Sequence, residues 1–105
     1  MNVFSAMRQA AALQQKMAEV QARLAERTVE FSSGGGAVTV TVRGDLEVTS
    51  VRIQPEVIED RDRALMEDLV RAAVNGGLRA AREMMERELA AVARELGLPP
   101  GFAGR

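Results

Sequence analysis

The side chains best suited to chemistry are basic ones that recur along two predicted helices. In the first helix, Lys16, Arg23 and Arg27 lie within about 40° of one another at 100° per residue, with Arg8 at the margin. Arginine is well suited to phosphate because its planar guanidinium donates several N–H groups at once. The spacing therefore predicts a stripe that can contact a polyanion.

A second basic stripe is predicted on the last helix, where Arg79, Arg87 and Arg94 fall within about 80° of one another. Acidic residues are interleaved with both stripes, namely Glu19, Glu26, Glu83, Glu86 and Glu95. A solvated helix face is therefore the alternative interpretation, and charge alone favours it. With three Phe and no Tyr or Trp, no aromatic platform for single-stranded nucleic acid is predicted.

The composition limits what else the chain can do. Its 14 basic and 15 acidic residues give a net charge of −1, which is not the strongly basic balance of a typical nucleic-acid binder. The absence of His and Cys removes the commonest general base, the thiol nucleophile and the usual zinc ligands. Lys16 is the sole lysine and lies on a solvated face. We expect no enzyme activity, no metal, no cofactor and no small-molecule substrate.

Two further motifs could suggest a binding site. The acidic residues between 56 and 62 do not have the spacing of a calcium-binding loop, and carboxylates just before a helix are favoured by its dipole. Gly34, Gly35 and Gly36 are followed by a strand and lack the Gly-Lys-Ser/Thr ending of a phosphate-binding loop. We interpret the first motif as the approach to a helix and the second as a hairpin loop.

Periodicity predicts the elements that carry the basic stripes. Apolar residues at spacings of three and four predict helices over residues 3–26 and 63–96, with Gly97 as the stop. Alternation predicts strands over residues 28–33, 37–43 and 46–53, joined by short turns as an antiparallel meander. A change of parity between Val48 and Val51 predicts a bulge near Thr49 and Ser50. The fold class is therefore α+β.

The middle of the last helix contains a pair of glycines, Gly76 and Gly77. Each glycine costs about 1 kcal/mol relative to alanine inside a helix. We interpret the pair as a place where the helix closely approaches the sheet or a partner chain, in preference to a hinge.

The predicted helices are long for so small a domain. At 1.5 Å per residue they measure about 36 and 50 Å, whereas a compact 100-residue domain has a radius of gyration near 13 Å. Their apolar stripes must therefore be covered beyond the sheet, either by the other helix of the same chain or by a second chain. Because three strands also leave open edges, we expect a homodimer with projecting helical arms.

The expected location is cytoplasmic. No apolar segment approaches the roughly 20 residues that span a bilayer, and the first residues lack the pattern of a signal peptide. Membrane partners are therefore not expected. We predict a single domain over residues 1–98 and a disordered tail over residues 99–105.

The order of these features resembles the YbaB/EbfC family of nucleoid-associated proteins. The match runs over most of the chain, and its strength is the order of short motifs more than any one of them. The segments that carry it are 7–10 (MRQA), 14–17 (QQKM), 36–44 (GAVTVTVRG), 51–55 (VRIQP), 69–75 (LVRAAVN) and 98–102 (LPPGF).

The resemblance implies a homodimer whose arms project like tweezers from a joined sheet. It also implies binding to double-stranded DNA with little sequence preference in many members, and a role in the bacterial nucleoid or in gene expression. The DNA-binding candidates are then Arg8, Lys16, Arg23, Arg27, Arg79, Arg87 and Arg94. A protein-interaction module, whose helical arms bind a protein partner, is the alternative function.

Overall fold

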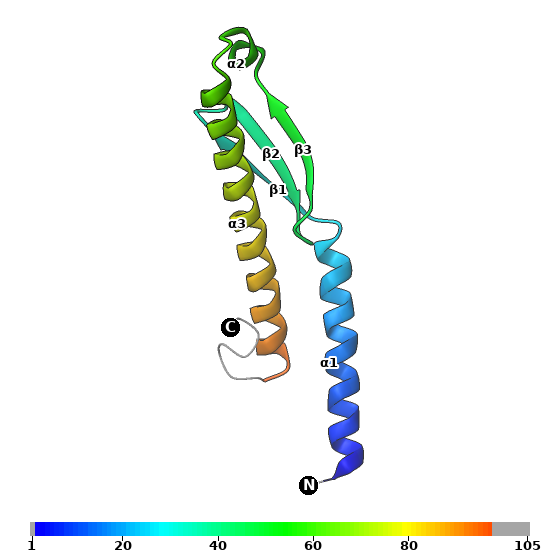
Figure 1. The fold of residues 1–105 in the computed structure, drawn as a ribbon. Coiled ribbons are helices and arrows are strands. Elements are labelled where there is room, and N and C mark those ends of the chain that lie inside the picture. The colour runs from blue at the N-terminus through cyan, green and yellow to red at the C-terminus, as the bar shows by residue number, and fades with distance from the viewer. Residues whose placement is uncertain (1, 98–105) are drawn as a thin grey trace.

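The elements follow one another in the predicted order. A computed structural model describes residues 2–97, so the expected disordered tail 99–105 lies outside the described residues. The elements are α1 (Val3–Leu24), β1 (Thr28–Ser33), β2 (Val38–Arg43), β3 (Val48–Ile53), α2 (Pro55–Glu59) and α3 (Arg63–Glu95) (Figure 1). The predicted α+β class is confirmed.

Side chains and a glycine fix the ends of the two long helices. The Asn2 side chain accepts a hydrogen bond from the Phe4 amide at 2.9 Å, and Asp62 accepts one from the Leu65 amide at 3.0 Å. Both satisfy amides that have no partner within the helix. Gly97 takes a left-handed φ of 71° after α3, which confirms the predicted stop.

The three strands form one antiparallel sheet in the order β1-β2-β3. Thr41 lies opposite Ser50, but Val42 lies opposite Val48, so Thr49 is the extra residue of a bulge. This confirms the predicted change of parity. The third strand begins at Val48 and not at residue 46, because Leu46 has a φ of 68° and belongs to the turn.

Helix α3 packs across one face of the sheet, mainly over β1 and β2. We call this face, which includes the buried side chains of Val38, Val40 and Val42, the inner face. The inner face of β3 is left partly uncovered: Val51, opposite Val40, is 46% exposed. The predicted close approach is made to the sheet, because a β-carbon on Gly77 would lie 2.7 Å from a Val40 methyl.

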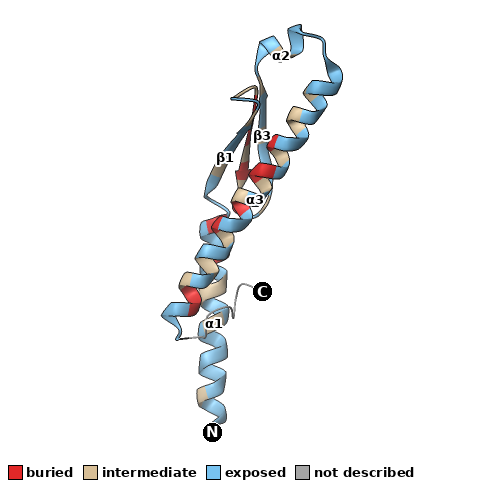
Figure 2. Cartoon of the chain, turned by 90° about the vertical axis from the view of Figure 1, so that its left-hand side faces the viewer, coloured by how far each residue is buried: buried red, intermediate tan, exposed pale blue. Residues whose placement is uncertain are grey.

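Below the sheet, α1 and the C-terminal half of α3 run antiparallel as a projecting arm (Figure 1). Val20, Leu24, Met84 and Val92 form its buried core. Figure 2 shows that burial stops partway down α1, whose N-terminal turns are almost wholly exposed. The molecule measures 68 × 22 × 16 Å and has a radius of gyration of 19.1 Å, so the predicted overhang is confirmed.

The short connection after the sheet contains one helical turn. Pro55 begins the helical turn α2, and its fixed φ suits a first helical position. Arg61, with a φ of 58°, then lies in the turn that leads to α3.

Candidate nucleic-acid interface

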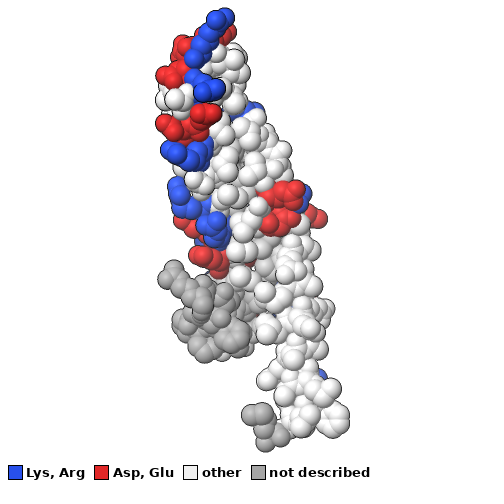
Figure 3. All heavy atoms as spheres, in the orientation of Figure 1, with Lys and Arg blue, Asp and Glu red and all other residues white. Residues whose placement is uncertain are grey.

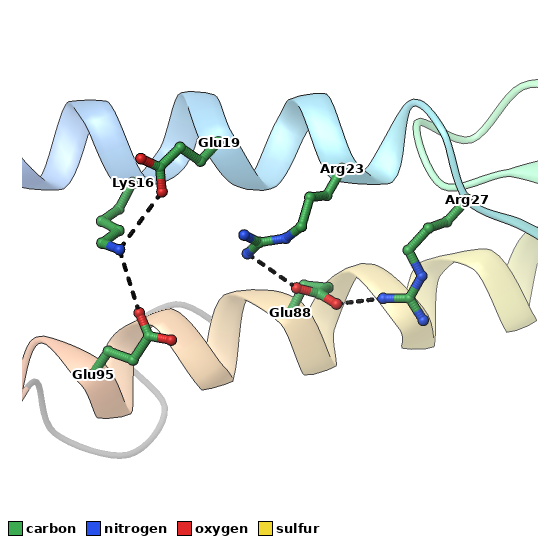
Figure 4. Close-up of polar contacts among 6 residues, drawn as sticks. All are labelled: Lys16, Glu19, Arg23, Arg27, Glu88 and Glu95. Carbon is green, nitrogen blue, oxygen red and sulfur yellow. Dashed lines mark hydrogen bonds and ion pairs between the residues drawn. The ribbon is translucent and has the colours of Figure 1, made fainter.

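The predicted basic residues Lys16, Arg23 and Arg27 face α3 along the arm (Figure 4). Arg27 does not lie on the helix as predicted, because α1 ends at Leu24 and Arg27 belongs to the connection before β1. Lys16, halfway along α1, places its Nζ 3.8 Å from Oε2 of Glu95 and 3.6 Å from Oε2 of Glu19. All three side chains are 42–59% exposed. The contacts are long and solvated, and such pairs contribute only about 0–1 kcal/mol to folding.

Arg23 and Arg27 share a single carboxylate, that of Glu88 on α3 (Figure 4). Nη2 of Arg23 donates to Oε2 at 3.3 Å, and Nη1 of Arg27 donates to Oε1. The two arginine side chains are 52% and 50% exposed, whereas Glu88 is 21% exposed. Two guanidinium charges therefore meet one carboxylate, and each guanidinium keeps a face in solvent.

The remaining candidates are exposed. Arg8 lies on the N-terminal half of α1, and Arg79, Arg87 and Arg94 lie along α3. None of these four forms an ion pair with another residue in the range 2–97. Figure 3 shows basic and acidic side chains alternating along α3, as the sequence indicates. The structure thus leaves these four guanidiniums accessible. Of the seven candidates, only Lys16, Arg23 and Arg27 contact acidic residues of α3 within the described residues.

The basic residues of the sheet are on its outer face, away from α3. Arg52 pairs with Glu30 of β1 at 3.3 Å across the central strand. Arg43 donates to both carboxylate oxygens of Asp45 at 2.7 Å. This hydrogen bonding lowers the pKa of Asp45 below its ordinary value and raises the pKa of Arg43 above its ordinary value. Both arginines are thus matched by carboxylates of the same face or the adjoining turn.

The end of α1 carries a different surface. Of residues 1–15 only Arg8 is charged, and Figure 3 shows this part of the helix almost free of charged side chains. Val3 and Phe4 are each 70% exposed and Met7 is 61% exposed. A shallow apolar groove continues this surface toward the end of α3. It is lined by Ala6, Gln9, Ala10, Ala12, Leu13 and Leu96.

The two motifs that could have suggested another site have structural roles. Asp62 of the acidic segment caps α3, and within residues 2–97 no group of acidic residues is arranged to hold a metal. Gly34, Gly35 and Gly36 all have positive φ and form the tight β1–β2 turn. Within residues 2–97, neither α1 nor α3 contains an apolar stretch of the length that spans a bilayer.

A family model described as the YbaB/EbfC DNA-binding family matches residues 1–96. The chain belongs to this family. The resemblance drawn from the short motifs is confirmed, and the elongated α-β-β-β-α-α arrangement is the form that this YbaB/EbfC chain takes.

Relatives of similar length support the assignment. A nucleoid-associated protein of Syntrophobacter fumaroxidans is 46% identical over 96 residues, covering 91% of this chain and 87% of that one. One from Alkaliphilus metalliredigens is 42% identical, covering 96% and 89% of the two chains. A solved structure, that of the uncharacterized protein HP0035 from Helicobacter pylori, superposes with a TM-score of 0.78. At 21% identity over 92% of this chain and 99% of that one, it shows the same fold.

Sequence reasoning missed Glu88, the residue of α3 that contacts two of the candidate arginines. At 100° per residue Glu88 lies about 180° from Arg79, on the same face of α3 as the buried Ala81, Met84 and Val92. The helical period therefore separates it from Glu83 and Glu86, and a carboxylate on the apolar face is the signal that could have found it. Its contact with Arg27 joins residues that are 61 positions apart in the sequence. The contact depends on the axial register of α1 against α3. Arg82, which is also exposed on α3, lies outside the predicted stripe as well.

Proposed function

We propose that this YbaB/EbfC chain is a non-enzymatic, homodimeric protein that binds double-stranded DNA through its helical arms. The family match over residues 1–96 carries the proposal. Relatives named nucleoid-associated proteins support a location in the bacterial nucleoid, within the cytoplasm, and effects on nucleoid organisation or gene expression. The proposal includes no cofactor, no metal, no membrane and no small-molecule substrate.

The electrostatics require local contacts. With a net charge of −1 the chain has no overall field that would attract a polyanion, so binding depends on particular basic side chains. Exposed guanidiniums recur along the arm at Arg79, Arg87 and Arg94, and Arg8 extends the series on α1. Contacts to phosphate carry no base information, so little sequence preference is expected.

The dimer is supported by the uncovered part of the sheet. Val48 and Val51 face the same side as the buried valines of β2 but are 36% and 46% exposed, because α3 covers β1 and β2. Among residues 2–97, no strand lies beside the outer edge of β3. A second copy of the chain can cover these apolar side chains and at the same time pair a strand with the edge of β3. The resulting dimer carries two basic arms.

A gel shift with two unrelated duplexes of equal length tests DNA binding directly. We expect the folded protein to retain both duplexes at about 50 mM salt and to release both as salt rises, because binding releases counterions from the DNA and that release becomes less favourable at high salt. Failure to retain either duplex at low salt, with the protein folded by circular dichroism, would overturn the proposal.

One observation favours the alternative function, a protein-interaction module. The N-terminal part of α1 offers Val3, Phe4 and Met7 to solvent with a single charge nearby, which is typical of a protein-binding surface more than of a DNA-binding one. A folded chain that retains neither duplex would favour this function.

A further inference from the structure

One acidic side chain holds two of the candidate DNA-binding arginines. The Glu88 carboxylate uses one oxygen for Arg23 and the other for Arg27, and it reaches them from the opposite helix of the arm (Figure 4). Carboxylate and phosphate oxygens are alternative acceptors for the same guanidinium N–H groups. Glu88 therefore occupies donors that a DNA backbone would use.

We propose that Glu88 is an internal competitor of DNA phosphate and sets the affinity of the arm. The inference rests on the proposed DNA binding and deepens it. When a phosphate approaches, Arg23 and Arg27 exchange at least part of their contact with Glu88 for the phosphate oxygens. The native carboxylate thus keeps binding weaker, and less dependent on salt, than two free arginines would make it.

The geometry makes such an exchange feasible. Both guanidiniums are about half exposed, so a phosphate can approach from solvent without opening the arm. The arm itself is held by the buried side chains of Val20, Leu24 and Met84, which do not depend on the ion pairs. Exposed ion pairs contribute little to folding. Glu88 therefore has more influence on the charge offered to DNA than on the stability of the fold.

Glu88 differs in this respect from the other acidic residues of the arm. Glu95 is 59% exposed and approaches only Lys16, at 3.8 Å, so it can turn away at little cost. Glu86 is exposed and forms no ion pair within residues 2–97. Glu88 is the more buried partner of two cations at once, and this position makes it the effective competitor.

The test compares DNA affinity by fluorescence anisotropy of a labelled duplex over a salt series. Glu88→Gln should bind several-fold more tightly at about 50 mM salt. Its plot of log affinity against log salt should be steeper by about 0.9 for each additional phosphate that the arm neutralises. Glu86→Gln is the matched control, because it removes the same charge from the same helix without releasing an arginine.

Two more variants separate competition from simple charge and from structure. Glu88→Asp keeps the net charge but shortens the side chain, so it should also raise affinity, by less than Glu88→Gln. In an Arg23→Gln/Arg27→Gln background, Glu88→Gln should bring no further increase in affinity. Melting curves establish that each variant is folded, and Glu88→Asp serves as the test should Glu88→Gln be unstable.

The outcomes are distinct. Equal increases in affinity for Glu88→Gln and Glu86→Gln, or weaker binding by both Glu88 variants, would overturn the inference and leave DNA binding itself intact. Absence of binding by every folded protein in the series would overturn the proposed function and the inference together.

Discussion

The ring of Phe31 lies against Gly76 and fills the space that a β-carbon at that position would need. Phe31 belongs to β1 and Gly76 to the middle of α3, so this contact sets how closely the helix lies on the sheet. The neighbouring Gly77 approaches Val42 in the same way, with its β-carbon position 2.8 Å from a methyl group. The glycine pair is thus a packing feature and not a hinge.

Gly76→Leu should therefore destabilise the fold even though leucine favours helix. Overpacking costs about 1–3 kcal/mol, against a gain of up to about 1 kcal/mol in helix propensity. Thermal denaturation followed by circular dichroism measures the difference. Ala72→Leu, at an exposed position one turn earlier in α3, should leave the melting temperature nearly unchanged. Equal melting of the Gly76 and Ala72 variants would contradict the close-packing interpretation.

Short-range patterns predict this fold better than they predict its interface. The alternation of Val38, Val40 and Val42 specifies the buried face of β2, and the glycine pair marks where α3 meets it. These features depend on neighbours in the sequence. The pairing of Arg23 and Arg27 with Glu88 depends on the axial register of two helices, which no local period specifies. The sequence therefore places the basic residues on helices without showing which of them meet an acid.

The uncovered inner face of β3 makes a prediction about assembly. Light scattering of the purified protein should give about twice the chain mass of 11.4 kDa. Val51→Asp should shift the protein toward the monomer, because it places a charge on the apolar surface that a second copy would cover. Ser50→Asp, on the outer face of the same strand, is the matched control. A monomeric wild-type protein at all concentrations would contradict the dimer.

The uneven packing of α1 predicts uneven hydrogen exchange. Val20 and Leu24 are buried against α3, whereas residues 3–10 have almost no tertiary cover. Isolated helices shorter than about 12–15 residues are marginal in water. Amides in the first turns should exchange at rates close to those of an unfolded peptide, whereas amides near Val20 should be protected. Uniform protection along α1 would show that another surface covers its N-terminal half.

The Arg43–Asp45 pair predicts a specific pH dependence. Because hydrogen bonding to Arg43 lowers the pKa of Asp45 in the folded state, the pair stabilises the fold above the unfolded value of about 3.9. That stability is lost as pH falls through the lower, folded pKa. Asp45→Asn should have a slightly lower melting temperature than wild type at pH 7, and this difference in melting temperature should disappear as pH falls below about 4.

Asp60→Asn is the control for this pH dependence. Asp60 has no ion-pair partner within residues 2–97, so its substitution removes the same charge without breaking an ion pair. A gap for Asp45→Asn that stays constant down to pH 3 would contradict the account of the pair.

The most direct test of DNA binding by the arms compares two sets of substitutions in one salt series. Wild type should show log affinity falling with log salt at a slope near −4 to −5, as expected for about four to six neutralised phosphates. Arg79→Gln/Arg87→Gln/Arg94→Gln should weaken binding and flatten the slope while the protein remains folded. Arg43→Gln/Arg52→Gln, on the outer face of the sheet, should change both much less. Loss of binding in the sheet variant, with the arm variant binding as wild type does, would contradict DNA binding through the arms.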